Sequence, residues 1–243
     1  MNTKVLIGGI TGLLIGLIAG FLVANSLNKS EIEAARSELA AAKNASSAQK
    51  GGSKVELSDE EIRAKMAEAD KNADNFEYQK TLGLALYTYA AMKQQASLLE
   101  DVQRLLDRAY KLNGEDYDVI VSLANVSFDL GQIKKDDSQN TKARELYQKA
   151  LSKNEKDANV RTDLGLTYLQ ASKPDSDAAI AELNKALELD PNNEKALRYM
   201  TQAQASKGDT AKAKEYLEKL RTADPHNPAI PELEARVGPS DKK

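Results

Sequence analysis

A pattern of small and large residues that recurs along the C-terminal half is the strongest constraint on how this chain can fold. Within residues 157–191 it has two parts, Leu164, Gly165 and Tyr168 followed by Ala179, Leu183, Ala186 and Pro191. Small residues let two antiparallel helices approach closely, and large residues three or four positions away fill the space around them. Proline cannot continue a helix and would end the unit. The window therefore predicts one helical hairpin.

Copies of the pattern lie on both sides of this window. The second-helix part recurs 34 residues further on, at Ala213, Leu217, Leu220 and Pro225, with Met200 and Thr201 in the first-helix positions. Upstream the spacing is 41 residues, for Leu82-Gly83, Leu123-Ala124 and Leu164-Gly165 and for Ala109 and Ala150. A single hairpin leaves one apolar face uncovered, and stacked copies bury it. The sequence thus predicts an all-α solenoid of about four helical hairpins.

The expected hairpins pair residues 76–92 with 98–112, 117–130 with 142–152, 158–171 with 176–189, and 194–206 with 210–222. A flanking helix is expected at 58–69, where Ser58 and Glu61 form a capping box, and a capping helix at 231–237. The solenoid domain then spans residues 58–237, and 238–243 form a disordered tail. The extra residues of the two longer repeats are expected in loops at 92–98 and 131–141.

The Leu-Gly-x-x-Tyr first helix and the second-helix alanines with their closing proline resemble the tetratricopeptide repeat family over about 60% of the chain. In that family the first helices line a groove that binds a protein or peptide partner. Aligning the repeats on the Leu-Gly pair, the resemblance implies a partner groove made of Lys80, Leu84, Tyr87, Val121, Asn125, Phe128, Thr162, Leu166, Leu169, Arg198 and Gln202. A mixed apolar and polar groove of this kind suits an extended or helical peptide.

Residues 5–24 contain no charged side chain and are long enough to cross a bilayer core of about 30 Å. We expect residues 1–26 to be a transmembrane anchor. A cleaved signal peptide is the alternative, because Lys4 provides a basic start and residues 24–26 fit a cleavage site. Four glycines recur at every fourth position and could pack against another helix, although glycine is also common in membrane helices: Gly8, Gly12, Gly16 and Gly20.

Residues 27–57 are expected to form a helical stalk and a flexible linker. Ser30 and Glu33 form a possible capping box for a helix that ends near residue 43. Its apolar positions have heptad spacing, which fits either a short coiled coil or a monomeric stalk: Ile32, Ala35, Leu39 and Ala42. Residues 44–53 have the composition of a linker.

The composition argues against catalysis. The chain has no cysteine, a net charge of -3, and one histidine, His226, which lies in a predicted turn. We therefore expect no enzyme activity, no metal site and no cofactor, and no nucleic acid as partner.

The favoured function is a membrane-tethered interaction scaffold or adaptor that recruits a protein or peptide partner. Similarity to bacterial membrane-anchored tetratricopeptide factors implies a role in envelope assembly or export. It also implies a single-pass protein of the bacterial inner membrane with the solenoid on the periplasmic side, although Lys29 and Arg36 leave the orientation open. The alternative is a homo-oligomeric membrane scaffold assembled through the glycine stripe.

Overall fold

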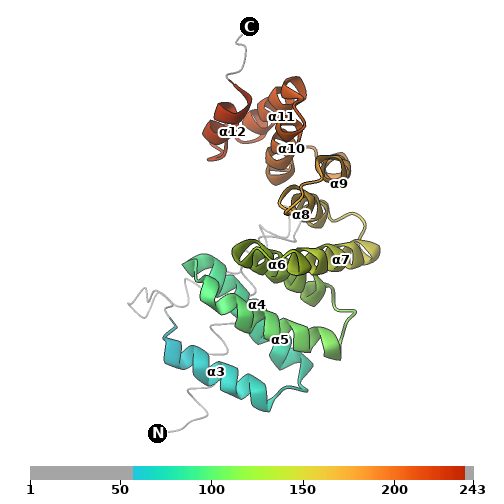
Figure 1. Cartoon of the computed structure of the whole chain (residues 1–243). Helices are drawn as coiled ribbons and strands as arrows, with labels where there is room; N and C mark the ends of the chain where they lie inside the picture. Colours follow the sequence, from blue (N-terminus) through green and yellow to red (C-terminus); the bar gives the residue numbers. More distant parts are fainter. Residues whose placement is uncertain (1–56, 239–243) are drawn as a thin grey trace, which may run out of the picture. The chain divides into compact units, whose positions relative to one another are not determined.

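The computed structural model describes residues 57–238, which form an array of α-helices with one 3-10 turn (Figure 1). The predicted all-α array of helical hairpins is confirmed. The expected anchor, stalk and linker, together with the tail from residue 239, lie outside the described residues. Within residues 57–238, no helix is both long and apolar enough to span a membrane.

The described chain divides after Leu112 into two compact units. The N-terminal unit contains α3 (Asp59–Lys71), α4 (Phe76–Lys93), the 3-10 turn (Ala96–Leu98) and α5 (Leu99–Leu112). In this unit α4 and α5 pair as a hairpin, and α3 packs against α4.

The C-terminal unit contains three hairpins and a final helix. They are α6 (Tyr117–Lys134) with α7 (Asp137–Lys153), α8 (Ala158–Leu169) with α9 (Ser176–Leu189), α10 (Glu194–Ser206) with α11 (Thr210–Ala223), and then α12 (Ile230–Val237). Leu233 and Val237 of α12 are buried in an apolar cluster with Leu217 and Leu220 of α11. The last helix therefore covers the apolar surface that the final hairpin would otherwise expose.

Side-chain caps determine where most of these helices begin. Eight helices start after a residue whose side chain accepts a hydrogen bond from a backbone N–H of the first turn: Ser58, Asn75, Asp116, Asp136, Asp157, Asp175, Asn193 and Asp209. Each such cap satisfies a donor that the helix itself leaves unpaired.

The two helices of a hairpin approach closely at the predicted small residues. A Cβ atom on Gly83 of α4 would lie 2.8 Å from Leu106 Cδ2 of α5, and one on Gly165 of α8 would lie 3.0 Å from Leu183 Cγ of α9. The other predicted core residues of the helices are buried as well: Leu82, Ala109, Leu123, Ala124, Ala150, Leu164, Ala179, Ala186 and Ala213. Tyr168 is half-buried, and its ring centroid lies 5.3 Å from the guanidinium carbon of Arg144.

The predicted loop at residues 131–141 is wrong. Helix α6 continues to Lys134 and α7 begins at Asp137, so the extra residues lengthen both helices of the hairpin. The chain reverses at Lys135, which adopts a left-handed conformation with φ 54°. The lengthened helices pack tightly, because a Cβ atom on Gly131 would lie 2.4 Å from Asn140 Oδ1 and 3.1 Å from the Asn140 backbone nitrogen.

Gly131→Ala is expected to destabilise the protein. Overpacking against Asn140 should cost about 1–3 kcal/mol, which exceeds the gain of about 1 kcal/mol from replacing glycine with alanine in a helix. Urea unfolding followed by far-UV circular dichroism measures the free energy of unfolding. The double variant with Asn140→Ala should show that the two effects are not additive, since the clashing side chain is gone. A single variant as stable as the parent would contradict this packing.

Candidate functional site

Hydrogen bonds join the N-terminal ends of successive first helices in the C-terminal unit. The Tyr117 hydroxyl of α6 donates to Asp157 Oδ2, the cap of α8, at 2.8 Å. Asn193, the cap of α10, donates from Nδ2 to Asn159 Oδ1 of α8 at 3.0 Å. Asn227, which precedes α12, donates to Glu194 Oε2 of α10 at 3.0 Å. These contacts link α6 to α8 and α8 to α10. We call the partly exposed side of these three first helices the first-helix face.

Five of the predicted groove residues in this unit keep part of their surface exposed: Val121, Asn125, Leu169, Arg198 and Gln202. Three others do not. Phe128 is 8% exposed, Leu166 is 6% exposed, and Thr162 is fully buried with its hydroxyl donating to the Ala158 carbonyl oxygen at 2.7 Å. The assignment of these three side chains to a groove is corrected: they belong to the packed interior.

The predicted groove residues of the N-terminal unit lie on α4. Lys80 and Tyr87 are half-buried, and the Lys80 ammonium nitrogen lies 6.0 Å from the centre of the Phe76 ring. Leu84 is only 9% exposed. Its assignment to a partner groove is corrected for the same reason as that of the three buried residues in the C-terminal unit.

Asn125 is held in a defined orientation by its own hairpin. The hydroxyl of Tyr147, a buried residue of α7, donates to Asn125 Oδ1 at 2.7 Å. The carbonyl end of the amide is therefore engaged, whereas the amide nitrogen has no acceptor within residues 57–238. Its two N–H groups can donate to a ligand.

The guanidinium group of Arg198 in α10 also has hydrogen-bond donors that the described residues do not use. Its guanidinium carbon lies 4.4 Å from the centre of the Tyr199 ring, and Nη2 donates to the Tyr199 hydroxyl. Nε is buried and has no partner in the described part of the chain, and no acceptor lies at Nη1 there. Stacking on an aromatic ring fixes the plane of the guanidinium, which suits recognition of a carboxylate or a carbonyl oxygen.

Asp163 and Lys195 form an ion pair between α8 and α10 that the sequence analysis missed. Burial raises the pKa of the Asp163 carboxyl, and the Lys195 ammonium opposes that rise. Burial alone would lower the pKa of Lys195, but the charge of Asp163 and their hydrogen bond outweigh it, so this pKa is raised. Opposite charges one repeat apart in neighbouring first helices were a signal that could have identified the pair.

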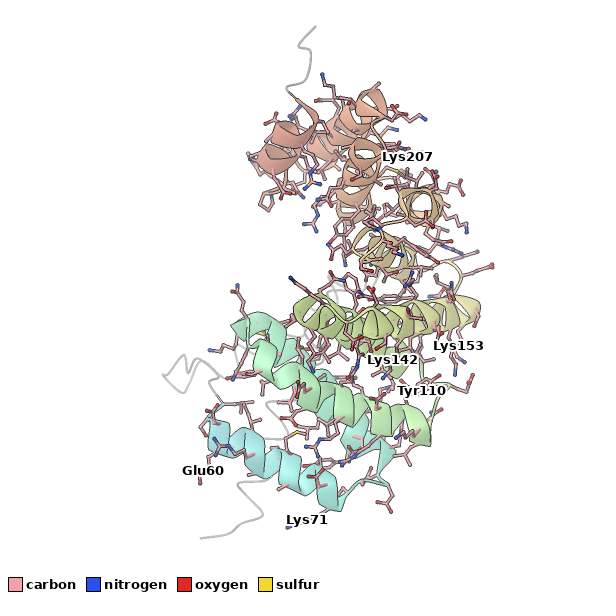
Figure 2. The ribbon with its side chains drawn as sticks, viewed as in Figure 1. Glu60, Lys71, Tyr110, Lys142, Lys153 and Lys207 are labelled. Carbon is pink, nitrogen blue, oxygen red and sulfur yellow. The ribbon has the colours of Figure 1, made fainter. Side chains whose placement is uncertain are left out.

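The site thus combines fixed hydrogen-bond donors with small apolar surfaces and an ion pair. Residues 57–238 contain no group of three or more His, Cys, Asp or Glu side chains that could hold a metal ion. His226 is exposed in the turn before α12, where its backbone N–H donates to Asp224 Oδ1 at 3.0 Å. Figure 2 shows the side chains of the unit, with Lys142 and Lys153 labelled on α7.

A known family model matches the C-terminal part of the chain. Residues 175–237 match the family model described as tetratricopeptide repeat. No curated protein matches the chain by sequence.

Several solved structures have a similar fold. One is a MamA protein, with 21% identity and a TM-score of 0.54 over 75% of this chain and 87% of the other. MamA 41-end from Desulfovibrio magneticus has 21% identity and a TM-score of 0.55 over 70% and 86%. A tetratricopeptide repeat protein from Parabacteroides merdae has 17% identity and a TM-score of 0.56 over 73% and 63%. The described chain therefore has the fold of a tetratricopeptide-repeat protein.

Asp163→Asn tests the electrostatics of the first-helix face. Because the pKa of Asp163 is raised in the folded state, the folded chain binds more protons than the unfolded chain just above the ordinary aspartate pKa. The parent should therefore lose stability as pH rises through the folded-state pKa. Asparagine does not titrate, so the stability of the variant relative to the parent should rise over that window. Urea unfolding from acidic to neutral pH measures the difference.

Asp177→Asn is the control, because Asp177 forms an ion pair whose carboxylate side chain is 78% exposed. The stability of this variant relative to the parent should show no comparable rise with pH. If the parent instead gains stability relative to Asp163→Asn as pH rises, the attraction of Lys195 has a larger effect on the pKa of Asp163 than burial does.

Proposed function

We propose that this tetratricopeptide-repeat protein is a membrane-tethered adaptor that holds a protein or peptide partner on the first-helix face of its C-terminal unit. One observation carries the proposal. The chain of hydrogen bonds through Asp157, Asn193 and Asn227 fixes the first helices by their N-terminal ends. These hydrogen bonds involve none of the five partly exposed side chains of the face, which leaves those side chains available to a ligand.

The chemistry of these side chains favours a polypeptide ligand. Asn125 offers its amide N–H groups and Arg198 offers Nη1, donors that the described residues leave unused, and main-chain carbonyl oxygens are the acceptors that every polypeptide presents. Val121 and Leu169 add partly exposed apolar surface. A partner with a carboxylate or carbonyl oxygen aimed at Arg198 would gain a charge-assisted hydrogen bond.

Residues 5–24 support the membrane tether, because an uncharged stretch of that length matches the thickness of a bilayer core. The adaptor would lie at the bacterial inner membrane, with the array on the periplasmic side, and would act in envelope assembly or export rather than as an enzyme. A tether serves such an adaptor by raising the local concentration of partner sites at the bilayer.

Leu169→Glu should disrupt partner binding. A photo-crosslinking residue at Gln202 of the full chain captures the partner in cells, and mass spectrometry identifies it. A charge placed among the apolar contacts of the face should reduce capture by at least about tenfold, which corresponds to roughly 1.4 kcal/mol.

Leu189→Glu is the matched control, because Leu189 is 41% exposed and lies at the end of α9, a second helix. It should leave capture unchanged while both variants keep the helix content of the parent. Equal loss in the two variants would contradict the location of the site. Capture of this chain alone would favour the homo-oligomeric scaffold.

Removing residues 1–26 should release the protein from membranes. The full chain should stay in the membrane pellet after alkaline carbonate extraction, and the shortened chain should appear in the supernatant. Intact mass separates the two interpretations of the segment, since a cleaved signal peptide would leave a mature protein that starts near residue 25. Release of the full chain by carbonate would contradict the anchor.

A further inference from the structure

Helix α3 has the residue spacing of a second helix. Its buried residues Ile62, Met66 and Ala69 are separated by four and three positions. Buried residues with the same spacing occur in every second helix of the array: Val102, Leu106 and Ala109; Ala143, Tyr147 and Ala150; Ala179, Leu183 and Ala186; and Ala213, Leu217 and Leu220. Those helices each pair with a first helix that precedes them. The described chain begins two residues before α3, so no first helix precedes α3 among residues 57–238.

Residues of α3 and α4, together with Leu57, line an apolar pocket. It has a volume of about 130 Å³ and is lined by Leu57, Glu61, Ile62, Ala64, Lys65, Leu82 and Leu86. An apolar cavity of about 150 Å³ accepts a group the size of benzene. The pocket therefore has room for a single leucine or isoleucine side chain.

We propose that residues 30–43 dock on α3 as the first helix of a fifth hairpin and place Leu39 in this pocket. The segment has 14 residues, comparable with the 12 of α8 and the 13 of α10. Its Ser30 and Glu33 repeat the capping-box spacing that Ser58 and Glu61 use at the start of α3.

The direction of the chain selects Leu39 over Ile32. The two helices of a hairpin are antiparallel, so the C-terminal half of the first helix lies beside the N-terminal half of the second. The pocket residues of α3, from Glu61 to Lys65, lie in its N-terminal half. Leu39 is the large apolar residue in the C-terminal half of the segment, whereas Ile32 is near its start.

The connection favours this chain as the occupant. Residues 44–57 join the segment to α3. In an antiparallel hairpin the end of the first helix lies near the start of the second, so this connection has only a short distance to span. Closing a loop of this length adds little entropy cost compared with a shorter turn. A flexible tether supplies an effective concentration in the millimolar range, which a second copy or a separate protein does not match at ordinary concentrations.

Docking would shorten the connection between the proposed membrane helix and the first packed helix. With the segment free, residues 25–57 would separate the proposed membrane helix from α3. With it docked, only residues 25–29 would separate the membrane from a packed helix. The N-terminal unit would then lie close to the bilayer. This consequence rests on the proposed anchor, whereas the docking itself does not.

Paired cysteines test the contact in the full chain, which contains no cysteine of its own. Leu39→Cys with Lys65→Cys should form a disulfide within one chain on mild oxidation. Leu39→Cys with Arg63→Cys is the matched control, because Arg63 is exposed and lies about 200° around the helix from Lys65. The tether serves both pairs equally, so docking should make the first disulfide form at least about tenfold faster. Peptide mapping of the monomer band measures both rates.

Hydrogen exchange provides a second readout. Leu39→Asp should speed amide exchange in α3 and leave α11 unchanged, while Ala41→Asp, on the other side of the segment, should have no effect. Equal disulfide rates for the two pairs, disulfides only between chains, or unchanged exchange in α3 would each overturn the proposal. Figure 2 labels Glu60 and Lys71 at the two ends of α3, the helix on which exchange is measured.

Discussion

The close approach of the two helices within each hairpin is the contact on which the array depends. Gly83 and Gly165 leave no room for a Cβ atom beside Leu106 and Leu183, and alanines with no exposed surface, such as Ala109 and Ala186, complete the second helices. Interiors packed at this density tolerate few rearrangements. Each hairpin therefore behaves as a rigid element with a defined thickness. Polar contacts between hairpins can then set register without having to supply most of the stability.

The lengthened hairpin of α6 and α7 shows how such polar contacts work. Asn140, which is 3% exposed, accepts a hydrogen bond from Gln132 Nε2 at 2.9 Å, and the same nitrogen reaches the Gln170 carbonyl oxygen after α8 at 3.2 Å. At the start of α7, Asp137 accepts hydrogen bonds from Ser172, which also follows α8, and these lower the pKa of its carboxyl. The added length thus joins one hairpin to the next. These contacts fix the C-terminal end of α8, and the hydrogen bond to Asp157 fixes its N-terminal end.

The sequence predicted the hairpins because their pattern depends on residue size, and size is what close packing selects. It failed at residues 131–141, where the segment is polar and lacks apolar periodicity. Helix there depends on the Asp136 cap, on the left-handed turn at Lys135 and on the tertiary bonds of Asn140. None of these is a local propensity. Only some of the predicted groove residues are partly exposed, for a related reason. The position of a residue in the repeat indicates the side of the helix on which it lies, but it does not indicate how deeply a neighbouring hairpin buries that side. Phe128 and Leu166 were therefore misplaced, and Asp163 and Lys195 were overlooked.

Burial of those side chains changes what the first-helix face can recognise. With Phe128 and Leu166 in the interior, the apolar surface of the face is small, so affinity cannot come mainly from burying large apolar anchors. A net charge of -3 also gives little long-range attraction to a charged partner. In the proposed adaptor, recognition of the partner would then depend on oriented polar groups. Tyr147 orients Asn125 and the Tyr199 ring orients Arg198, so both donors are fixed before a partner arrives. Donors fixed in this way lose little conformational entropy on binding, and a partner that leaves either one unpaired pays a desolvation penalty. In the proposed adaptor, the face would therefore discriminate between partners by where they present their acceptors rather than by how apolar they are.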